Sequence, residues 1–142
     1  MEENTLLLNF IIERGNFLTA GNASSKIKKI LQSIGLENSL IRKISIATYE
    51  AEMNLVIHSL GGNIKAYIDE NKVTIEVEDT GPGIKDIDLA MTEGYSTATN
   101  EIREMGFGAG MGLPNIRRCA DEFHIESIVG QCTKLEIIIY NT

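Results

Sequence analysis

The chain alternates apolar and polar residues near its start, and this pattern predicts a strand. Residues 4–13 carry an apolar side chain at every second position: Leu6, Leu8, Phe10 and Ile12. A period of two places these side chains on one face, where a core can bury them. The same alternation predicts four more strands, in two pairs with a tight turn inside each pair: 63–69 with 72–79, and 123–129 with 132–140.

Apolar residues spaced three and four positions apart predict helices between these strands. The first helix covers about residues 22–34, and either Asn22 or Ser24 could cap its N-terminus. A third, short helix covers about 113–121. The second and longest covers about 39–60, with an apolar stripe made of Leu40, Ile44, Ala47, Ala51 and Leu55.

This order of elements predicts an α+β fold with one domain over residues 1–142. The length suits a single domain, and 43% hydrophobic residues suffice for a core. Strands that are adjacent in sequence favour pairing with each other. We therefore expect a two-layer α/β sandwich, with a mostly antiparallel mixed sheet and helices on one face.

Composition argues against several classes of function. The net charge of −7 disfavours a nucleic-acid-binding surface. The apolar runs are too short to span a bilayer, and no basic amphipathic helix is present. Residues 1–4 lack the features of a signal peptide, so we expect a cytoplasmic protein without a membrane contact. Cys119 and Cys132 form no C-x-x-C pair and fit reduced thiols.

Asp79 ends a predicted strand on its apolar face. Val73, Ile75 and Val77 precede it at every second position, so its carboxylate shares the face of the core side chains. A buried carboxylate needs a hydrogen-bond donor, and the exocyclic amine of adenine is one. Thr133 shares the inner face of the last strand, so both side chains could read one base edge. The alternative is that Asp79 only opens a surface turn.

The predicted long helix carries Glu50 and Asn54 at the edge of its apolar stripe. They are four residues apart and project from the same side. A carboxylate there can orient or deprotonate a hydroxyl, and an amide oxygen can bind Mg²⁺. A solvated helix edge is the alternative. His58 lies on the stripe itself, where a structural role is favoured over a catalytic one.

Glycines recur at every second position just before the third helix, in the segment 106–113 (GFGAGMGL). Closely spaced glycines let backbone N–H groups approach phosphates, and a helix start favours negative charge. A flexible turn is the alternative. No G-x-x-x-x-G-K-[ST] motif occurs, so a phosphate site here would not be a P-loop.

Four motifs in order resemble those of the GHKL ATPase superfamily. Residues 50–58 (E-x-x-x-N-x-x-x-H) resemble its N box, and residues 79–83 (D-x-G-x-G) resemble its first glycine box. Residues 106–113 resemble its second glycine box. Residues 130–133 (GQCT) resemble its closing Gly-x-Gly-Thr, with a cysteine in place of the usual glycine. The resemblance covers about 37–140 and implies the Bergerat ATP-binding fold.

The resemblance also implies ligands and roles. ATP and Mg²⁺ would bind, with Glu50 as the catalytic base, Asn54 as the Mg²⁺ ligand and Asp79 as the adenine reader. Other residues implied to contact the nucleotide are Gly81, Gly83, Ile84, Gly106, Phe107, Gly108, Ala109, Gly110, Met111, Gly112, Leu113 and Thr133.

The segment of about 84–107 is polar, weakly patterned and long for a loop inside a compact domain, which suggests a functional lid. The hydroxyls of Ser96 and Thr97 could meet phosphate oxygens, and Arg103 could bring positive charge to the γ-phosphate. An ordinary exposed loop is the alternative.

The small size resembles the anti-sigma-factor serine kinases and switch kinases within the superfamily. The leading interpretation is a protein serine/threonine kinase that transfers the ATP γ-phosphate to a serine of an antagonist-type, STAS-like regulatory partner. The alternative is a nucleotide-gated switch that captures a sigma factor or phosphatase without phosphotransfer. A homodimer is left open. A sensor histidine kinase is disfavoured, because neither His58 nor His124 sits on a separate dimerisation helix pair.

Overall fold

The structure is a computed structural model that describes residues 5–81, 87, 91 and 112–141. Its helices and strands begin and end within a few residues of the predicted positions. The strands are β1 (Leu6–Ile12), β2 (Gly62–Ile68), β3 (Lys72–Asp79), β4 (Glu122–Ile128) and β5 (Cys132–Tyr140). The helices are α1 (Asn22–Ser33), α2 (Asn38–His58) and α5 (Gly112–Cys119).

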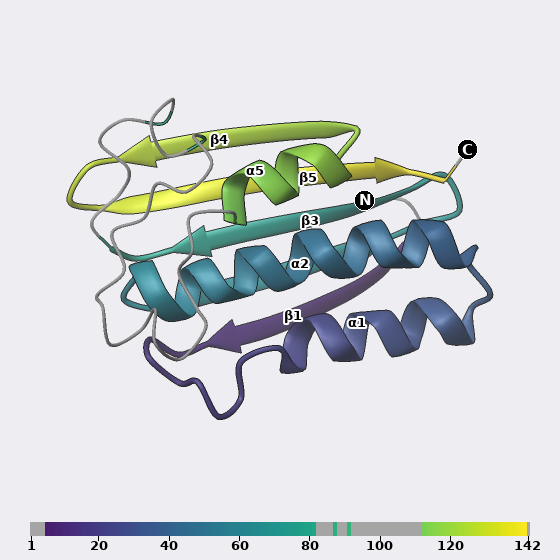
Figure 1. Cartoon of the computed structure of the whole chain (residues 1–142), viewed down its shortest axis with the longest axis horizontal. Coiled ribbons are helices and arrows are strands. Elements are labelled where there is room, and N and C mark those ends of the chain that lie inside the picture. Colours follow the sequence, from purple (N-terminus) through teal and green to yellow (C-terminus); the bar gives the residue numbers. More distant parts are fainter. Residues whose placement is uncertain (1–4, 82–86, 88–90, 92–111, 142) are drawn as a thin grey trace.

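The five strands form one sheet in the order β1-β2-β3-β5-β4, and the described helices lie side by side across one face of it (Figure 1). The α+β class and the two-layer sandwich are therefore confirmed. All four strand pairings are antiparallel. The mixed character that we expected is thus not found among the strands in the described ranges, because β5 returns between β3 and β4 with antiparallel neighbours on both sides.

The core fills the space between the helices and the inner face of the sheet. The predicted stripe of the long helix is buried at Ile44, Ala47, Ala51 and Leu55, while Leu40 is partly buried. Opposite it lie alternate residues of three central strands: Ile64, Ala66, Ile68, Val73, Ile75, Val77, Leu135, Ile137 and Ile139. Burial follows the helical period on α2 and a period of two on the strands, as the sequence pattern predicts.

A buried carboxylate joins α1 to α2. Glu52 is 1% exposed and accepts hydrogen bonds from the backbone N–H groups of Gly21 (3.0 Å), Ala23 (3.2 Å) and Ser24 (3.1 Å). A helix leaves such first-turn N–H groups unpaired, and negative charge near them is favourable. The predicted cap by Asn22 or Ser24 is wrong: Gly21 is the N-cap residue, and the Ser24 hydroxyl donates to the Gly21 carbonyl.

Candidate functional site

Helix α2 presents Glu50 and Asn54 to the start of α5. Both side chains are half-buried. The first residue of α5, Gly112, lies against them: a Cβ placed there would be 3.1 Å from Asn54 Oδ1 and 3.3 Å from Glu50 Oε2. The structure thus brings the end of the second glycine cluster to the two polar residues of the long helix.

Because Gly112 has no side chain, its backbone approaches these two oxygens closely, and the N-terminus of α5 lies beside them. Oxygen ligands suit Mg²⁺, and a helix N-terminus suits phosphate, so the residues present fit both groups. No group of three His, Cys, Asp or Glu residues that could hold a metal occurs in the described part of the chain. A Mg²⁺ ion here would take its other ligands from phosphate and water, as it commonly does.

Asn115 belongs to the site although the sequence motifs did not single it out. Its Nδ2 donates to Glu50 Oε1 (3.4 Å), and its Oδ1 accepts from Arg118 Nη1 (2.9 Å). Because Arg118 has only donors, it fixes the amide so that the NH₂ group faces Glu50. The three-residue steps from Gly112 to Asn115 and on to Arg118 put all three near one side of α5, which is the signal that could have revealed them.

Asp79 lies at the end of β3 with a half-buried carboxylate. Its Oδ1 accepts a hydrogen bond of 2.6 Å from the backbone N–H of Thr133. Burial raises the pKa of the Asp79 carboxyl, and the weaker opposing effect is the hydrogen bond from Thr133. Its second oxygen, Oδ2, accepts no hydrogen bond from any residue that the structure describes. One oxygen is therefore held in place, and the other has no hydrogen-bond partner among the described residues.

Thr133 is buried beside Asp79, so the structure brings the two together as expected. The contact between them runs through the Thr133 backbone. The Thr133 hydroxyl lies 3.2 Å from the hydroxyl of Ser127, which faces it across the β4–β5 pair. Ser127 was not predicted, although the alternation Phe123, Ile125, Ser127 places it on the inner face of its strand.

Two glycines hold the segment around Asp79 close to its neighbours. Gly62 pairs with Asp79, and a Cβ on Gly62 would lie 2.1 Å from a β3 carbonyl oxygen, so the strands meet closely only because the residue is glycine. Gly81 is buried and donates its N–H to the Gln131 carbonyl (3.1 Å). A Cβ on Gly81 would lie 3.2 Å from the nitrogen of Leu60, just beyond α2.

The described site residues gather at one end of the sandwich, toward the left of Figure 1, where α2 and β3 end and α5 and β5 begin. Leu113 is also there, but it is buried and packs in the core. The side chain of His58 is not described. Most of the predicted lid loop lies outside the described residues, and so do these predicted site residues: Gly83, Ile84, Ser96, Thr97, Arg103, Gly106, Phe107, Gly108, Ala109, Gly110 and Met111.

The sequence is similar to a known domain family and to several known bacterial proteins. The model of the histidine kinase-like ATPase domain family matches residues 19–139. The anti-sigma F factor of Thermoanaerobacter sp. (strain X514) is 38% identical over 105 residues, which cover 70% of each chain. The serine/threonine-protein kinase RsbT of Bacillus subtilis (strain 168) is 30% identical over 115 residues, which cover 78% of this chain and 80% of that protein.

The fold is also similar to one in the crystal structure of the SiaB-SiaC complex from Pseudomonas aeruginosa. The match has a TM-score of 0.61 and covers 96% of this chain and 90% of the other, at 14% sequence identity. This likeness concerns the fold alone. Among the helices of the described residues, none has both the length and the apolar character needed to cross a membrane.

Proposed function

This chain belongs to the histidine kinase-like ATPase domain family, and from that premise we propose that it is an ATP-dependent protein serine kinase of the anti-sigma type. Its substrate would be a serine of a partner regulatory protein. The observation that carries the proposal is the meeting of Glu50, Asn54 and Gly112 at the start of α5. The similarity to a relative that bears the name of a serine/threonine kinase supports it.

The described residues offer a separate contact for each part of ATP. Asp79 Oδ2 would accept the exocyclic amine of adenine, while Thr133 holds Oδ1. The phosphates would lie at the N-terminus of α5, whose first N–H groups Gly112 brings beside Glu50 and Asn54. Asn54 Oδ1 would hold Mg²⁺, which when bound neutralises charge on the phosphate oxygens.

Glu50 would accept the proton of the attacking hydroxyl. Asn115 donates a hydrogen bond to its Oε1, while its Oε2 lies beside Gly112. The serine oxygen forms a bond to the γ-phosphorus, the bond from that phosphorus to the β–γ bridging oxygen breaks, and the hydroxyl proton passes to Glu50. ADP leaves with the electron pair of the broken bond. A carboxylate held by a neighbouring amide is pre-oriented for this transfer.

A second candidate is a binding switch without phosphotransfer. Several relatives bear the name anti-sigma F factor and no kinase name, and this observation favours it. A switch would use the same contacts to adenine, phosphates and Mg²⁺. It would distinguish ATP from ADP through contacts to the last phosphate, because only a group that the two nucleotides do not share can favour one conformation over the other. It would not need a proton acceptor at Glu50.

Two substitutions on α2 test the division of roles. Asn54→Ala should remove most Mg²⁺-dependent ATP binding in calorimetry. Glu50→Gln should leave ATP binding nearly unchanged and lower turnover by roughly 10²–10⁴-fold, as expected when general-base chemistry is lost. Glu126→Gln, an exposed change on the outer face of the sheet, away from the helices, is the matched control. If Asn54→Ala and Glu50→Gln lose ATP binding equally, the proposed roles are wrong.

A further inference from the structure

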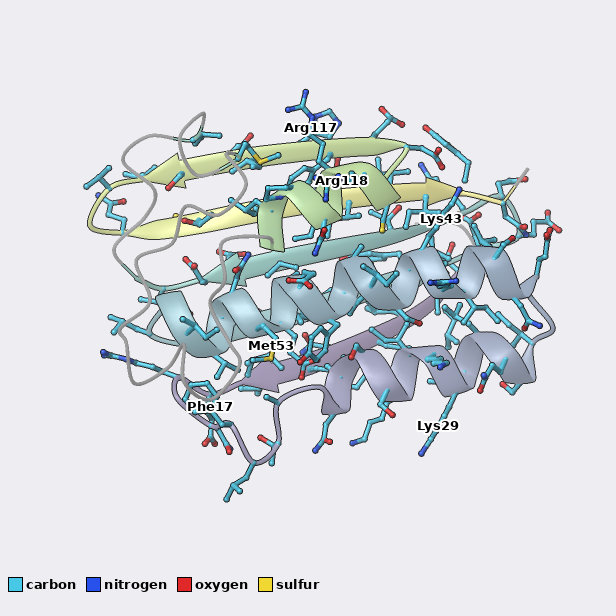
Figure 2. All side chains as sticks on the ribbon, viewed as in Figure 1. Phe17, Lys29, Lys43, Met53, Arg117 and Arg118 are labelled. Atoms are coloured by element: carbon cyan, nitrogen blue, oxygen red, sulfur yellow. The ribbon has the colours of Figure 1, made fainter. Side chains whose placement is uncertain are left out.

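Basic groups gather on the outer surface of α2 and α5. Arg42 and Lys43 lie on α2, Arg117 and Arg118 lie on α5, and all four are exposed. Residues 38–49 and 112–120 contain these four basic residues and no acidic residue, whereas the whole chain has a net charge of −7. Figure 2 shows Arg118 over α5 and Lys43 beside α2, with Arg117 above them toward β4. We call these four residues the basic surface.

The basic surface borders Glu50. Cys119, the last residue of α5, lies near both the basic surface and Glu50. Burial raises the pKa of its thiol most strongly. Lys43 and Arg118 lower this pKa, and Glu50 raises it. Lys43 also lies seven residues before Glu50, which is two helical turns along the same side of α2. A molecule that covers the basic surface would therefore extend to the proposed proton acceptor.

The helix dipole accounts for the positions of only two of these four basic residues. Arg117 and Arg118 occupy the last turn of α5, where positive charge complements the helix dipole. Arg42 and Lys43 lie in the second turn of α2, where the helix dipole does not stabilise positive charge. No ion pair among the described residues involves Arg42, Lys43 or Arg117. Their charge is therefore unexplained by contacts within the described chain.

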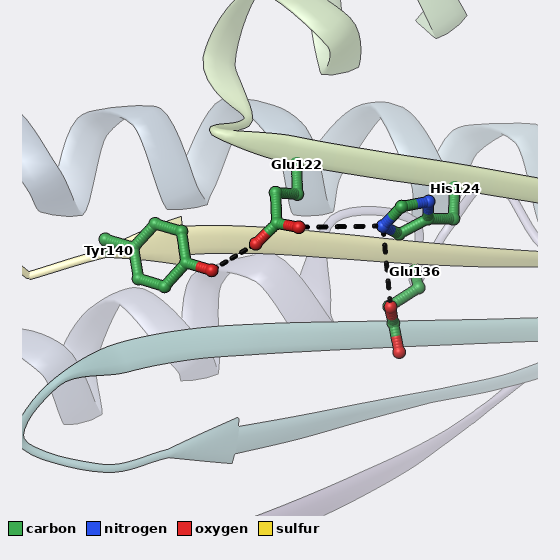
Figure 3. A network of polar contacts seen from close by, with 4 residues as sticks. All are labelled: Glu122, His124, Glu136 and Tyr140. Atoms are coloured by element: carbon green, nitrogen blue, oxygen red, sulfur yellow. Dashed lines mark hydrogen bonds and ion pairs between the residues drawn. The ribbon is translucent and has the colours of Figure 1, made fainter.

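The opposite face of the molecule is acidic. The outward positions of β3, β4 and β5 carry five carboxylates, Glu76, Glu78, Glu122, Glu126 and Glu136, against two lysines, Lys72 and Lys134. Some of them are paired locally. Lys134 lies 3.9 Å from Glu78. Figure 3 shows His124 3.9 Å from Glu122 and 4.0 Å from Glu136, with the Tyr140 hydroxyl donating to Glu122. The field of the protein therefore directs a negatively charged partner to the helical layer and away from the sheet.

We propose that the basic surface docks an acidic partner protein, whose Asp and Glu side chains flank the serine that it presents to Glu50. This inference rests on the proposed kinase function and adds the charge of the substrate. Ile46 is 37% exposed on α2 near Arg42 and Lys43, and it offers the apolar contact that a charged rim usually surrounds. A long polyanion fits less well, because the acidic remainder of the chain repels it beyond this small surface.

Two synthetic peptides of equal length test the docking surface: a central serine flanked by aspartates, and the same serine flanked by lysines. At low salt, the aspartate peptide should bind the wild-type protein about tenfold more tightly than the lysine peptide, with the gain lost at high salt. Lys43→Glu/Arg117→Glu should abolish this preference. Lys28→Glu/Lys29→Glu makes the same change in net charge on α1, where Figure 2 shows Lys29 far from the basic surface, and should retain it.

Equal binding of the two peptides, or a preference that survives Lys43→Glu/Arg117→Glu, would overturn the docking surface. Tighter binding of poly(U) RNA or of phosphatidylserine vesicles than of the aspartate peptide would also overturn it. So would sedimentation analysis showing that the protein self-associates and that this self-association blocks peptide binding. ATP affinity, measured on the same samples, separates the two proposals. Failure of the wild-type protein to bind ATP refutes the kinase, whereas intact ATP binding without a charge preference refutes only the docking surface.

Discussion

Replacing Asp79 by Asn tests nucleotide recognition at the level of single atoms. The Thr133 N–H donates to Asp79 Oδ1, so the carbonyl oxygen of an Asn side chain must occupy that position to keep the hydrogen bond. The Asn NH₂ group would then stand where Oδ2 stands now. It would face the exocyclic amine of adenine, and because both groups are hydrogen-bond donors, no hydrogen bond could form between them.

The expected loss follows from this geometry. One hydrogen bond to a charged group is lost, which is worth about 1.5–3 kcal/mol. This corresponds to a weakening of ATP binding by roughly 10–150-fold. The same NH₂ group could donate to the carbonyl oxygen that hypoxanthine carries in place of the amine. Asp79→Asn should therefore bind ITP better than ATP, which reverses the order expected for the wild-type protein.

Calorimetric titration with ATP and with ITP measures both effects. Glu78→Gln is the matched control, because it makes the same chemical change one residue earlier, on an exposed side chain of the outer face. It should leave both affinities unchanged. Unaltered ATP affinity in a folded Asp79→Asn variant, or equal losses for ATP and ITP, would refute adenine recognition by Asp79.

The same substitution has a predictable effect on stability. Burial raises the pKa of Asp79 above 3.8, so the folded state holds this proton more tightly than the unfolded state does. The free energy of unfolding therefore falls as pH rises through the window above 3.8. Asn carries no such proton. At neutral pH the ligand-free Asp79→Asn variant should be the more stable protein in urea denaturation, and the difference should shrink below pH 3.8.

Three further substitutions test other contacts. Glu52→Gln turns an NH₂ group toward one of the N–H donors at the start of α1. It should lower the free energy of unfolding in urea by about 2 kcal/mol. An unchanged free energy would contradict the role of Glu52 in binding these N–H groups. Gly62→Ala adds a Cβ 2.1 Å from a carbonyl oxygen and should cost about 3 kcal/mol or more, together with ATP affinity; wild-type stability would contradict the close strand contact. Asn115→Ala should lower turnover roughly tenfold, with ATP affinity unchanged, because Glu50 loses its orienting partner; unchanged turnover would contradict that role.

Periodicity in the sequence predicted the elements well, because burial depends on a local repeat. The stripe of α2 and the alternation along β3 and β5 needed no knowledge of the partner surfaces. The same reasoning placed Glu50 with Asn54 on one side of a helix, and Asp79 with Thr133 on the inner face of the sheet. These pairs follow from geometry within an element or from alternation on two strands.

The sequence did not predict contacts that depend on how separate helices and strands pack together. Glu52 lies 28 to 31 residues from the N–H groups that it binds, and only the packing of α1 on α2 brings them together. Asn115 and Glu50 are 65 residues apart, and their contact depends on the position of α5. Asn22 and Ser24 offered a local cap, but the buried charge of Glu52 satisfies the same donors from another helix.

The most direct test of the kinase proposal is the transfer of label from γ-labelled ATP. The protein would be incubated with Mg²⁺ and with purified candidate partners encoded by neighbouring genes, and the labelled residue identified by mass spectrometry. We predict label on a partner serine with the wild-type protein, and almost none with Glu50→Gln, although that variant still binds ATP. Nucleotide-dependent capture of a partner without label, or equal labelling by Glu50→Gln, would contradict phosphotransfer through Glu50.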